Sequence, residues 1–339
     1  MKILGIESSC DESAVSLVKI DKNSVKLIKN LISSQVEIHK QFGGIVPEVA
    51  ARHHVENFFP LLKELNIDIA RDVDLIAVTY GPGLITSLVI GLEFGKTLSF
   101  IYKKPLVAIN HIEAHIYSNW LTHKELFNNK KIFPALAVVI SGGHTQLFIM
   151  KNYGKYKLIG ETRDDAVGEA YDKVAKILGL EYPGGPIINQ LSCEFTKTPT
   201  IKFPLPMINT NDFDFSFSGL KTSVLYKFQK ETRQITDEII REYCNAFENS
   251  VCEVLSKKII KACQKYNVKN IILGGGVSAN SSIRDRISDE AKKIGAKTYF
   301  PEKKHTGDNA AMIAIAGYFN RDKKKKNNFT ITADPNLKL

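Results

Sequence analysis

The sequence is poor in the features that mark secreted, membrane or metal-thiolate proteins. Its five cysteines among 339 residues are scattered and include no Cys-x-x-Cys pair, which disfavours a disulfide framework and a zinc-thiolate site. No stretch of uncharged apolar residues approaches the length that a membrane span needs. The first residues read as a buried strand and lack the sections of a secretory signal or a transit peptide. We therefore expect a soluble protein of the cytoplasm that makes no membrane contact.

Acidic residues are fewer than basic ones. Lys and Arg number 46 against 36 Asp and Glu, which gives a formal net charge of +10. Such a surplus favours a polyanionic partner such as nucleic acid, because neutralised phosphates release counterions. The one charge run, residues 323–326, is equally well explained as a solvated tail. Charge alone leaves both interpretations open.

Two similar halves are present in the chain. Strand-like runs at Lys2–Glu7 and 14–20 flank a polar turn at 8–13, and runs at Ala135–Ile140 and 145–150 flank the turn 141–144. Because the length exceeds that of one hydrophobic core, we expect two α/β lobes around a cleft. Their predicted bounds are 1–130, with a C-terminal helix of about 305–320 packing back, and 131–304, followed by a basic tail at 321–339.

Helices and strands alternate in the rest of the sequence, which is typical of layered α/β lobes. The periodicity predicts helices at Pro47–Leu65, 86–102, 165–178, 236–266 and 278–294, with strands at 74–80, 105–110 and 270–273. Thr236 stands where a helix N-cap is expected.

Three turns follow predicted strands and carry small or polar residues, at 8–13, 141–144 and 274–280. Glycine lets backbone N–H groups approach a phosphate, and a following helix N-terminus adds positive potential. Any one of these turns is most often simply a turn, and Gly274-Gly275-Gly276 is neither a Rossmann nor a P-loop pattern. Together they predict a nucleotide clamp.

His111 and His115 are four residues apart, so on a helix both imidazoles project from one face and can bind one metal ion. A packing or capping pair has the same spacing. The residue after His111 is Ile112 and not the glutamate that a zincin protease uses as its base, so the pattern disfavours a metalloprotease.

Several motifs occur together in the order of one known family. They are IESSCDES at 6–13, HIEAH at 111–115, SGGHT at 141–145, DFDFSFSGLK at 212–221 and GGVSAN at 275–280. With these motifs the chain resembles, over nearly its whole length, the bacterial tRNA N6-adenosine threonylcarbamoyltransferases, once described as O-sialoglycoprotein endopeptidases.

The resemblance implies a two-lobed actin-like, sugar-kinase and heat-shock-70 fold. It implies transfer of a threonylcarbamoyl group from threonylcarbamoyl-AMP to N6 of adenosine 37 in tRNAs that read codons beginning with A. It also implies two protein partners, an inactive paralogue of the enzyme and a small P-loop ATPase. A tRNA substrate would account for the basic charge.

The resemblance also implies a site for one divalent metal ion per chain, with His111, His115 and Asp308 as ligands. Two imidazoles and a carboxylate suit Fe²⁺, with Zn²⁺ as the alternative. On sequence alone Asp308 is equally well placed to cap a helix that begins after it.

The substrate residues that the resemblance implies are main-chain donors near phosphate, a carboxylate for hydroxyl groups and a late loop around the nucleoside. They are Val139, Ile140, Ser141, Gly142, Gly143, Asp172, Gly185 and Asn280. Asn189 stands where many relatives carry an aspartate, so whether it contacts substrate is left open. Glu12 is a candidate catalytic base or orienting group, and a turn carboxylate bonded to local N–H groups is the plainer alternative.

Two other functions fit the same fold. A small-molecule kinase or ATPase would use the same phosphate turns, although such enzymes hold Mg²⁺ through oxygens and waters and do not need histidines. A catalytically silent nucleotide-binding scaffold would not need the histidine pair. The transferase is therefore the preferred interpretation.

Overall fold

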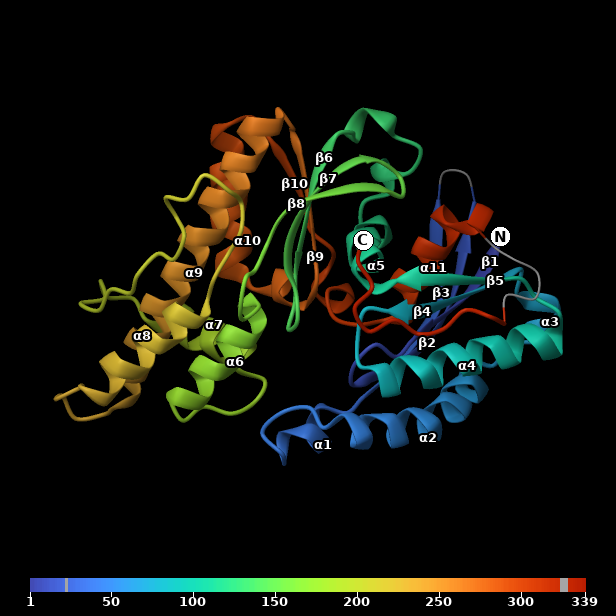
Figure 1. Ribbon diagram of the computed structural model, residues 1–339, viewed down its shortest axis with the longest axis horizontal. Helices are drawn as coiled ribbons and strands as arrows, with labels where there is room; N and C mark the ends of the chain where they lie inside the picture. Colours follow the sequence, from blue (N-terminus) through green and yellow to red (C-terminus); the bar gives the residue numbers. More distant parts are fainter. Residues whose placement is uncertain (22–23, 324–328) are drawn as a thin grey trace. The chain divides into compact units, whose positions relative to one another are not determined.

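The computed structural model describes residues 1–21, 24–323 and 329–339. The chain divides into two compact units, Met1–Lys130 with Pro301–Leu339, and Lys131–Phe300. Each unit contains one five-stranded mixed sheet with helices packed on it (Figure 1). The predicted α/β fold class is confirmed, and the second unit ends at Phe300, where the sequence had suggested 304.

The sheet of the first unit has the order β3-β2-β1-β4-β5. Its strands are β1 (Lys2–Glu7), β2 (Glu12–Ile20), β3 (Val25–Ser34), β4 (Leu75–Gly81) and β5 (Leu106–Asn110). The first three strands pair antiparallel, and β1, β4 and β5 run parallel. The predicted hairpin is present, but β2 already begins at Glu12, so the polar turn spans 8–11 alone.

Helices cover both faces of this sheet. They are α1 (Val36–Lys40), α2 (Pro47–Leu65), α3 (Ile69–Asp72), α4 (Ile85–Tyr102), α5 (His111–Tyr117) and α11 (Ala310–Phe319), with short 3₁₀ turns at Ser118–Leu121, Lys124–Leu126, Lys130–Ile132, Lys303–His305 and Arg321–Lys323. α2 and α4 pack on the face that carries Leu4 and Ile6. On the other face α11 lies so close that a Cβ on Gly5 would be 2.0 Å from the carbonyl oxygen of Ala310.

α4 is long and apolar enough, by length and composition, to cross a membrane, and among the described residues it alone meets that test. The sequence analysis had found no such segment, because Glu93 and Lys96 interrupt the apolar run. Half of the helix is buried within the protein, where it packs against α2 and β4. Burial of this kind is typical of a core helix.

The C-terminal segment at 329–339 packs on the first unit, whereas a solvated basic tail was expected there. Ile331 and Ala333 contact the apolar core, and the Asp334 N–H donates to the carbonyl oxygen of Tyr80 at 2.8 Å. Residues 324–328 of the predicted tail, which hold most of its lysine run, lie outside the described residues.

The second unit repeats the sheet topology of the first, with the order β10-β9-β6-β7-β8. Its strands are β6 (Ala135–Ile140), β7 (Thr145–Asn152), β8 (Lys155–Glu161), β9 (Asn270–Gly274) and β10 (Lys297–Tyr299). Again three strands pair antiparallel, and β6, β9 and β10 run parallel. The echo of the two hairpins in the sequence therefore corresponds to a duplicated fold.

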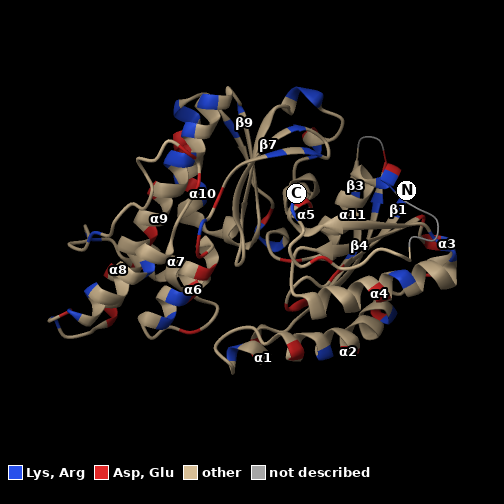
Figure 2. Ribbon diagram, viewed as in Figure 1, with Lys and Arg blue, Asp and Glu red and all other residues tan. Residues whose placement is uncertain are grey.

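The helices of the second unit are α6 (Val167–Ile177), α7 (Gly184–Glu194), α8 (Ser218–Gln229), α9 (Asp237–Tyr266) and α10 (Ser281–Lys293), with a 3₁₀ turn at Gly276–Ala279. α9 runs through the apolar core of this unit. Thr236 is its N-cap and accepts a hydrogen bond from the Ile239 N–H at 3.4 Å. Lys and Arg residues are spread over helices of both units (Figure 2).

Candidate functional site

The two histidines of the HIEAH motif lie on α5, which begins directly where β5 ends. Asn110, the last residue of β5, is its N-cap, and Asn110 Oδ1 accepts hydrogen bonds from the N–H groups of Ile112 and Glu113 at 2.8 and 3.1 Å. The cap fixes the first helical turn. His111 and His115 are both buried, with ring centroids 4.5 Å apart. The helical spacing thus puts both imidazoles on one face.

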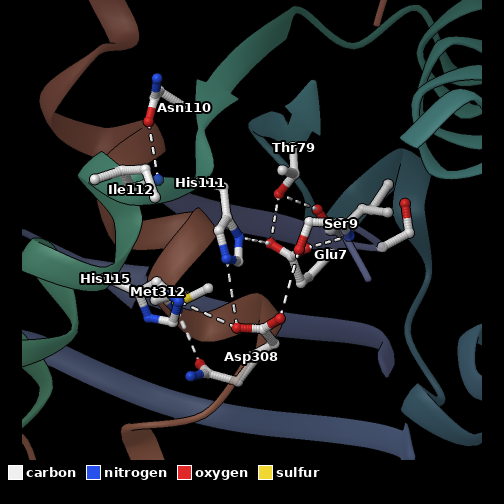
Figure 3. A network of polar contacts seen from close by, with 12 residues as sticks. Glu7, Ser9, Thr79, Asn110, His111, Ile112, His115, Asp308 and Met312 are labelled. Carbon is white, nitrogen blue, oxygen red and sulfur yellow. Dashed lines mark hydrogen bonds and ion pairs between the residues drawn. The ribbon is translucent and has the colours of Figure 1, made fainter. Parts of the chain in front are cut away.

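Asp308 reaches the histidines from the other end of the first unit's sequence. Its Oδ1 lies 3.1 Å from His115 Nε2 and 3.5 Å from His111 Nε2 (Figure 3). The helix α11 that follows is capped by Asn309, whose Oδ1 accepts from the Met312 N–H at 3.0 Å. The alternative interpretation of Asp308 as the helix cap is therefore wrong.

The three side chains fit a metal ion. One potential ligand atom from each lies within 4.8 Å of the others. The Nε2 atom of the buried His115 faces Asp308, and the Nδ1 atom has no hydrogen-bond partner among the described residues. A buried imidazole nitrogen that faces a carboxylate and a second imidazole is placed to share a cation with them. His111, His115 and Asp308 are thus able to hold a divalent ion.

Glu7, which the sequence analysis did not single out, orients His111. Its Oε2 lies 3.2 Å from His111 Nδ1 and accepts from Thr79 Oγ1 at 2.6 Å, and Oε1 accepts from the Ser9 N–H at 2.5 Å. Because the carboxylate accepts a hydrogen bond from Nδ1–H, Nε2 is the nitrogen that faces Asp308 and is left to a metal ion. A charged residue that ends an apolar strand was the available signal.

The charges in this network shift the pKa values of both Glu7 and His111. Burial alone would raise the pKa of Glu7, but the His111 charge and hydrogen bond outweigh it and lower that pKa. Burial alone would lower the pKa of His111, but Asp308 and Glu7 raise it to about 9. The network thus favours a positive charge on His111, at the place where a cation would sit.

Glu12 is the first residue of β2 and not the tip of the turn. Burial, followed by the neighbouring carboxylates of Asp308 and Asp11, raises its pKa well above the usual range. It is not among the groups that converge as metal ligands. A carboxyl group with a raised pKa is suited to proton transfer near neutral pH.

In the second unit the turn 141–144 lies at the N-terminus of α6. The Gly168 N–H donates to the Ser141 carbonyl at 3.2 Å, and Gly142 and Gly143 are exposed, with open space where a Cβ would be. The side chains of Val139 and Ile140 are fully buried in β6. Of the residues 139–143, the exposed backbone around Gly142 and Gly143 is therefore the part free to meet a ligand.

The third turn, at 274–280, lies directly beside the second. β6 and β9 are parallel neighbours, with Val139 opposite Gly274, and Gly275 packs against the carbonyl of Ile140. The carboxyl ends of parallel strands meet at one edge of a sheet, which is the usual place for a ligand. Two of the three predicted turns thus form one edge of the second unit.

Asp172, Gly185 and Asn280 adjoin this edge. Asp172 Oδ1 accepts from the Gly184 N–H at 2.8 Å, so it stands at the first turn of α7, where Gly185 lies. Burial raises the pKa of Asp172, and the Gly184 and Gly185 amides oppose that shift. Asn280 caps α10 through the Ile283 N–H at 3.0 Å, and its Nδ2 lies 3.3 Å from the hydroxyl of Tyr171.

Comparison with solved structures first defines the class of protein. The activator of the 2-hydroxyisocaproyl-CoA dehydratase from Clostridium difficile, solved with bound ADPNP, matches with a TM-score of 0.53 and 13% identity over 95% of this chain and 96% of that one. Full-length HypF in its phosphate- and nucleotide-bound form matches with a TM-score of 0.59 and 12% identity, over 95% and 55%. At these identities the likeness shows the fold alone, a two-lobed actin-like α/β fold.

Comparison of sequences then gives the family. The model of the TsaD family, tRNA N6-adenosine threonylcarbamoyltransferase, matches residues 26–315. Relatives of that name are 46% identical in Persephonella marina, over 94% of this chain and 90% of the relative, and 44% identical in Clostridioides difficile, over 99% and 98%. A relative from Thermosipho africanus is 44% identical over the full length of both chains.

The chain belongs to the tRNA N6-adenosine threonylcarbamoyltransferase family, a family of tRNA-modifying transferases. The resemblance found in the sequence is thereby confirmed, as is the transferase class. The kinase and scaffold alternatives are not favoured.

Proposed function

We propose that the chain transfers the threonylcarbamoyl group of threonylcarbamoyl-AMP to N6 of adenosine 37 in tRNAs that read codons beginning with A. The observation that carries this proposal is the group formed by the buried His111 and His115 with Asp308 in a member of this family. In the reaction the adenine N6 attacks the carbamoyl carbonyl, and a C–N bond forms. The C–O bond to phosphate breaks, AMP leaves, and N6 loses one proton.

We assign the adenylate to the loop edge of the second unit. Exposed N–H groups around Gly142 and Gly143, with the N-terminus of α6 behind them, supply donors and positive potential for a phosphate. The free lone pairs of Asp172 accept hydroxyl groups beside Gly185, and Asn280 adjoins the nucleoside. Bound nucleotides in the two solved proteins of the same fold support a nucleotide site here.

We assign the metal to His111, His115 and Asp308, with Fe²⁺ preferred and Zn²⁺ as the alternative. Such an ion, when bound, supplies a Lewis acid for a carbonyl or phosphate oxygen. Glu7 holds His111 in the tautomer that leaves Nε2 free. Glu12, in its carboxylate form, is the candidate acceptor for the N6 proton.

We further propose the partners that the family resemblance implies, namely tRNA, an inactive paralogue and a small P-loop ATPase, and the cytoplasm as the compartment. The net charge of +10 suits a nucleic acid, and Lys and Arg lie along α9 and α10 of the second unit (Figure 2). Counterion release from tRNA would then contribute to binding.

The test is incubation of the full chain with threonylcarbamoyl-AMP and unmodified tRNA, followed by mass spectrometry of the nucleosides. Modified adenosine is expected with the proposed partners present, and its absence when His115 is replaced by alanine. Consumption of ATP with a small acceptor and no modified nucleoside would point to the kinase instead.

A further inference from the structure

A buried carboxylate in the second unit joins the helices that carry the proposed nucleotide residues. Glu248 lies on α9 and is 1% exposed. Its Oε1 accepts from Asn280 Nδ2 at 2.6 Å and from the Tyr171 hydroxyl at 3.3 Å, and its Oε2 accepts from Ser282 Oγ at 2.8 Å. Asn189 Nδ2 donates to both oxygens, at 3.2 and 3.3 Å. Four neutral donors thus replace the cation that a buried carboxylate usually needs.

Both polar atoms of the Asn189 side chain make hydrogen bonds in this network. While Nδ2 faces Glu248, Oδ1 accepts from the Ser281 N–H at 3.3 Å and from Ser281 Oγ at 3.1 Å. The position therefore requires a donor on one side and an acceptor on the other, which an amide has and a carboxylate lacks. Asn189 and Glu248 form a matched pair of one amide and one carboxylate.

The pair lies next to every nucleotide residue assigned to a helix. Gly185 precedes Asn189 by one helical turn on α7, Asp172 follows Tyr171 on α6, and Asn280 caps α10. Each of α6, α7 and α10 thus has at least one hydrogen bond to the same carboxylate on α9. Loss of that acceptor would remove the hydrogen bonds that the three helices share and would allow their ends to move separately.

We propose that Glu248 is a positioning residue for the nucleotide site, and that Asn189 is its hydrogen-bond partner and not a substrate ligand. This inference rests on the proposed function, because it takes Asp172, Gly185 and Asn280 as the nucleotide residues. It explains why an asparagine stands at 189. With Glu248 opposite, an aspartate there would place two carboxylates in contact.

The test exchanges the two groups. Glu248→Gln replaces one of the two oxygens that accept from Asn189 Nδ2 by an amide nitrogen, and Asn189→Asp turns a carboxylate toward Glu248, so each single variant disturbs the pair. In the double variant the new carboxylate at position 189 still accepts from Ser281. The new amide at position 248 donates to that carboxylate, while its oxygen accepts from Asn280. One amide and one carboxylate are again paired, with the same net charge as in the natural chain.

Binding of AMP to the full chain is measured by calorimetry, and transfer is measured at varied threonylcarbamoyl-AMP. We expect each single variant to weaken AMP binding about tenfold and to raise KM more than it lowers kcat, and the double variant to recover to within about threefold of the natural chain. Asn249→Asp, at an exposed position next to Glu248 on α9, is the control for the added charge and should bind AMP normally. Ser282→Ala removes one donor only and gives a milder variant if a single exchange does not fold.

The outcomes separate this inference from the proposed function. If the natural chain binds no AMP, the nucleotide site itself is wrong. If it binds AMP and the Glu248→Gln and Ser282→Ala variants bind equally well, even with lowered melting temperatures, Glu248 only stabilises the fold. A double variant as weak as the single ones would overturn the pairing of 189 with 248.

Discussion

Glu7 Oε2 lies 3.2 Å from His111 Nδ1, while the other nitrogen of the same ring lies 3.5 Å from Asp308 Oδ1. The imidazole thus stands between a carboxylate that accepts a hydrogen bond from its Nδ1–H and the group that would share a metal ion. Ligand histidines in proteins commonly have such a partner, and its loss typically lowers metal affinity about 10- to 100-fold. Glu7 is not a ligand, so its effect is on the orientation and basicity of His111.

The Glu7→Gln variant keeps the shape of the side chain and removes its charge. We expect its affinity for Zn²⁺, measured by competition with a chelator, to fall about tenfold or more. Glu113→Gln is the matched control, because it also removes the charge of one buried carboxylate. Glu113 lies on α5 and accepts from Asn320 Nδ2 at 2.9 Å. An equal loss of Zn²⁺ affinity in both variants would show that the total negative charge near the site sets the affinity, and not the hydrogen bond between Glu7 and His111.

Replacement of a proposed metal ligand should lower metal binding more than the loss of Glu7 does. We expect His111→Ala, His115→Ala and Asp308→Ala each to abolish tightly bound metal and transfer, because too few protein donors then remain to hold the ion. Elemental analysis and melting curves are recorded on the same preparations, with His53→Ala, an exchange on α2 outside the site, as the control. Lowered melting temperatures with unchanged metal content in all three variants would refute the site.

His54 is expected to make the stability of the folded protein depend on pH. Its Nε2 lies 3.0 Å from the Cys10 carbonyl and its Nδ1 lies 2.7 Å from Ser13 Oγ. A carbonyl only accepts, so Nε2 carries the proton and the neutral ring accepts from Ser13. Burial lowers the pKa of His54. The bond to Cys10 and the charges of Glu7 and Asp11 oppose this shift, and His39 adds to it.

A histidine with a depressed pKa in the folded protein binds fewer protons than it does in the unfolded chain. Its contribution to stability is therefore complete above the unfolded pKa of about 6.5 and is lost as the pH falls below it. We expect the free energy of unfolding in urea to fall between about pH 6.5 and 5, by at most about 1.4 kcal/mol per pH unit for each such histidine. His54→Gln should reduce this slope. An identical slope in both proteins would contradict the assignment.

The sequence analysis identified the elements that local patterns determine, and it missed the residues whose roles depend on contacts between distant parts of the chain. The two hairpins, the α5 pair and the long helix with its Thr236 cap follow from periodicity and turn residues, and the structure has all of them. Glu7 and Glu248 acquire their partners from other elements across the fold. No pattern around Glu248 marks it, since a glutamate on a helix is usually exposed, and the one signal for Glu7 was its position at the end of an apolar strand.

The 212–221 motif shows the same limit. The motif is part of the family resemblance, but its sequence does not show that its side chains bond to residues 163–165. Arg163 pairs with Asp212 and Asp214, and Asp164 accepts from Ser216 and Ser218. The motif thereby anchors the segment that leads into α6, the helix behind the 141–144 turn. Only the folded chain shows that two stretches about fifty residues apart bond to each other.

The final prediction uses two neighbouring glycines in the third turn. Gly275 has φ of +91°, and a Cβ there would lie 2.3 Å from the carbonyl oxygen of Ile140, whereas Gly276 has open space in the same place. An L side chain at 275 must therefore adopt a disfavoured backbone conformation and also displace the end of β6, from which the 141–144 turn starts. We expect Gly275→Ala to cost about 1–3 kcal/mol or more of stability and to weaken AMP binding, because both turns move together. Gly276→Ala changes the same residue type one position later and should leave the melting temperature and AMP affinity close to those of the natural chain. If the two variants behave alike, the close approach of Gly275 to β6 does not shape the nucleotide site.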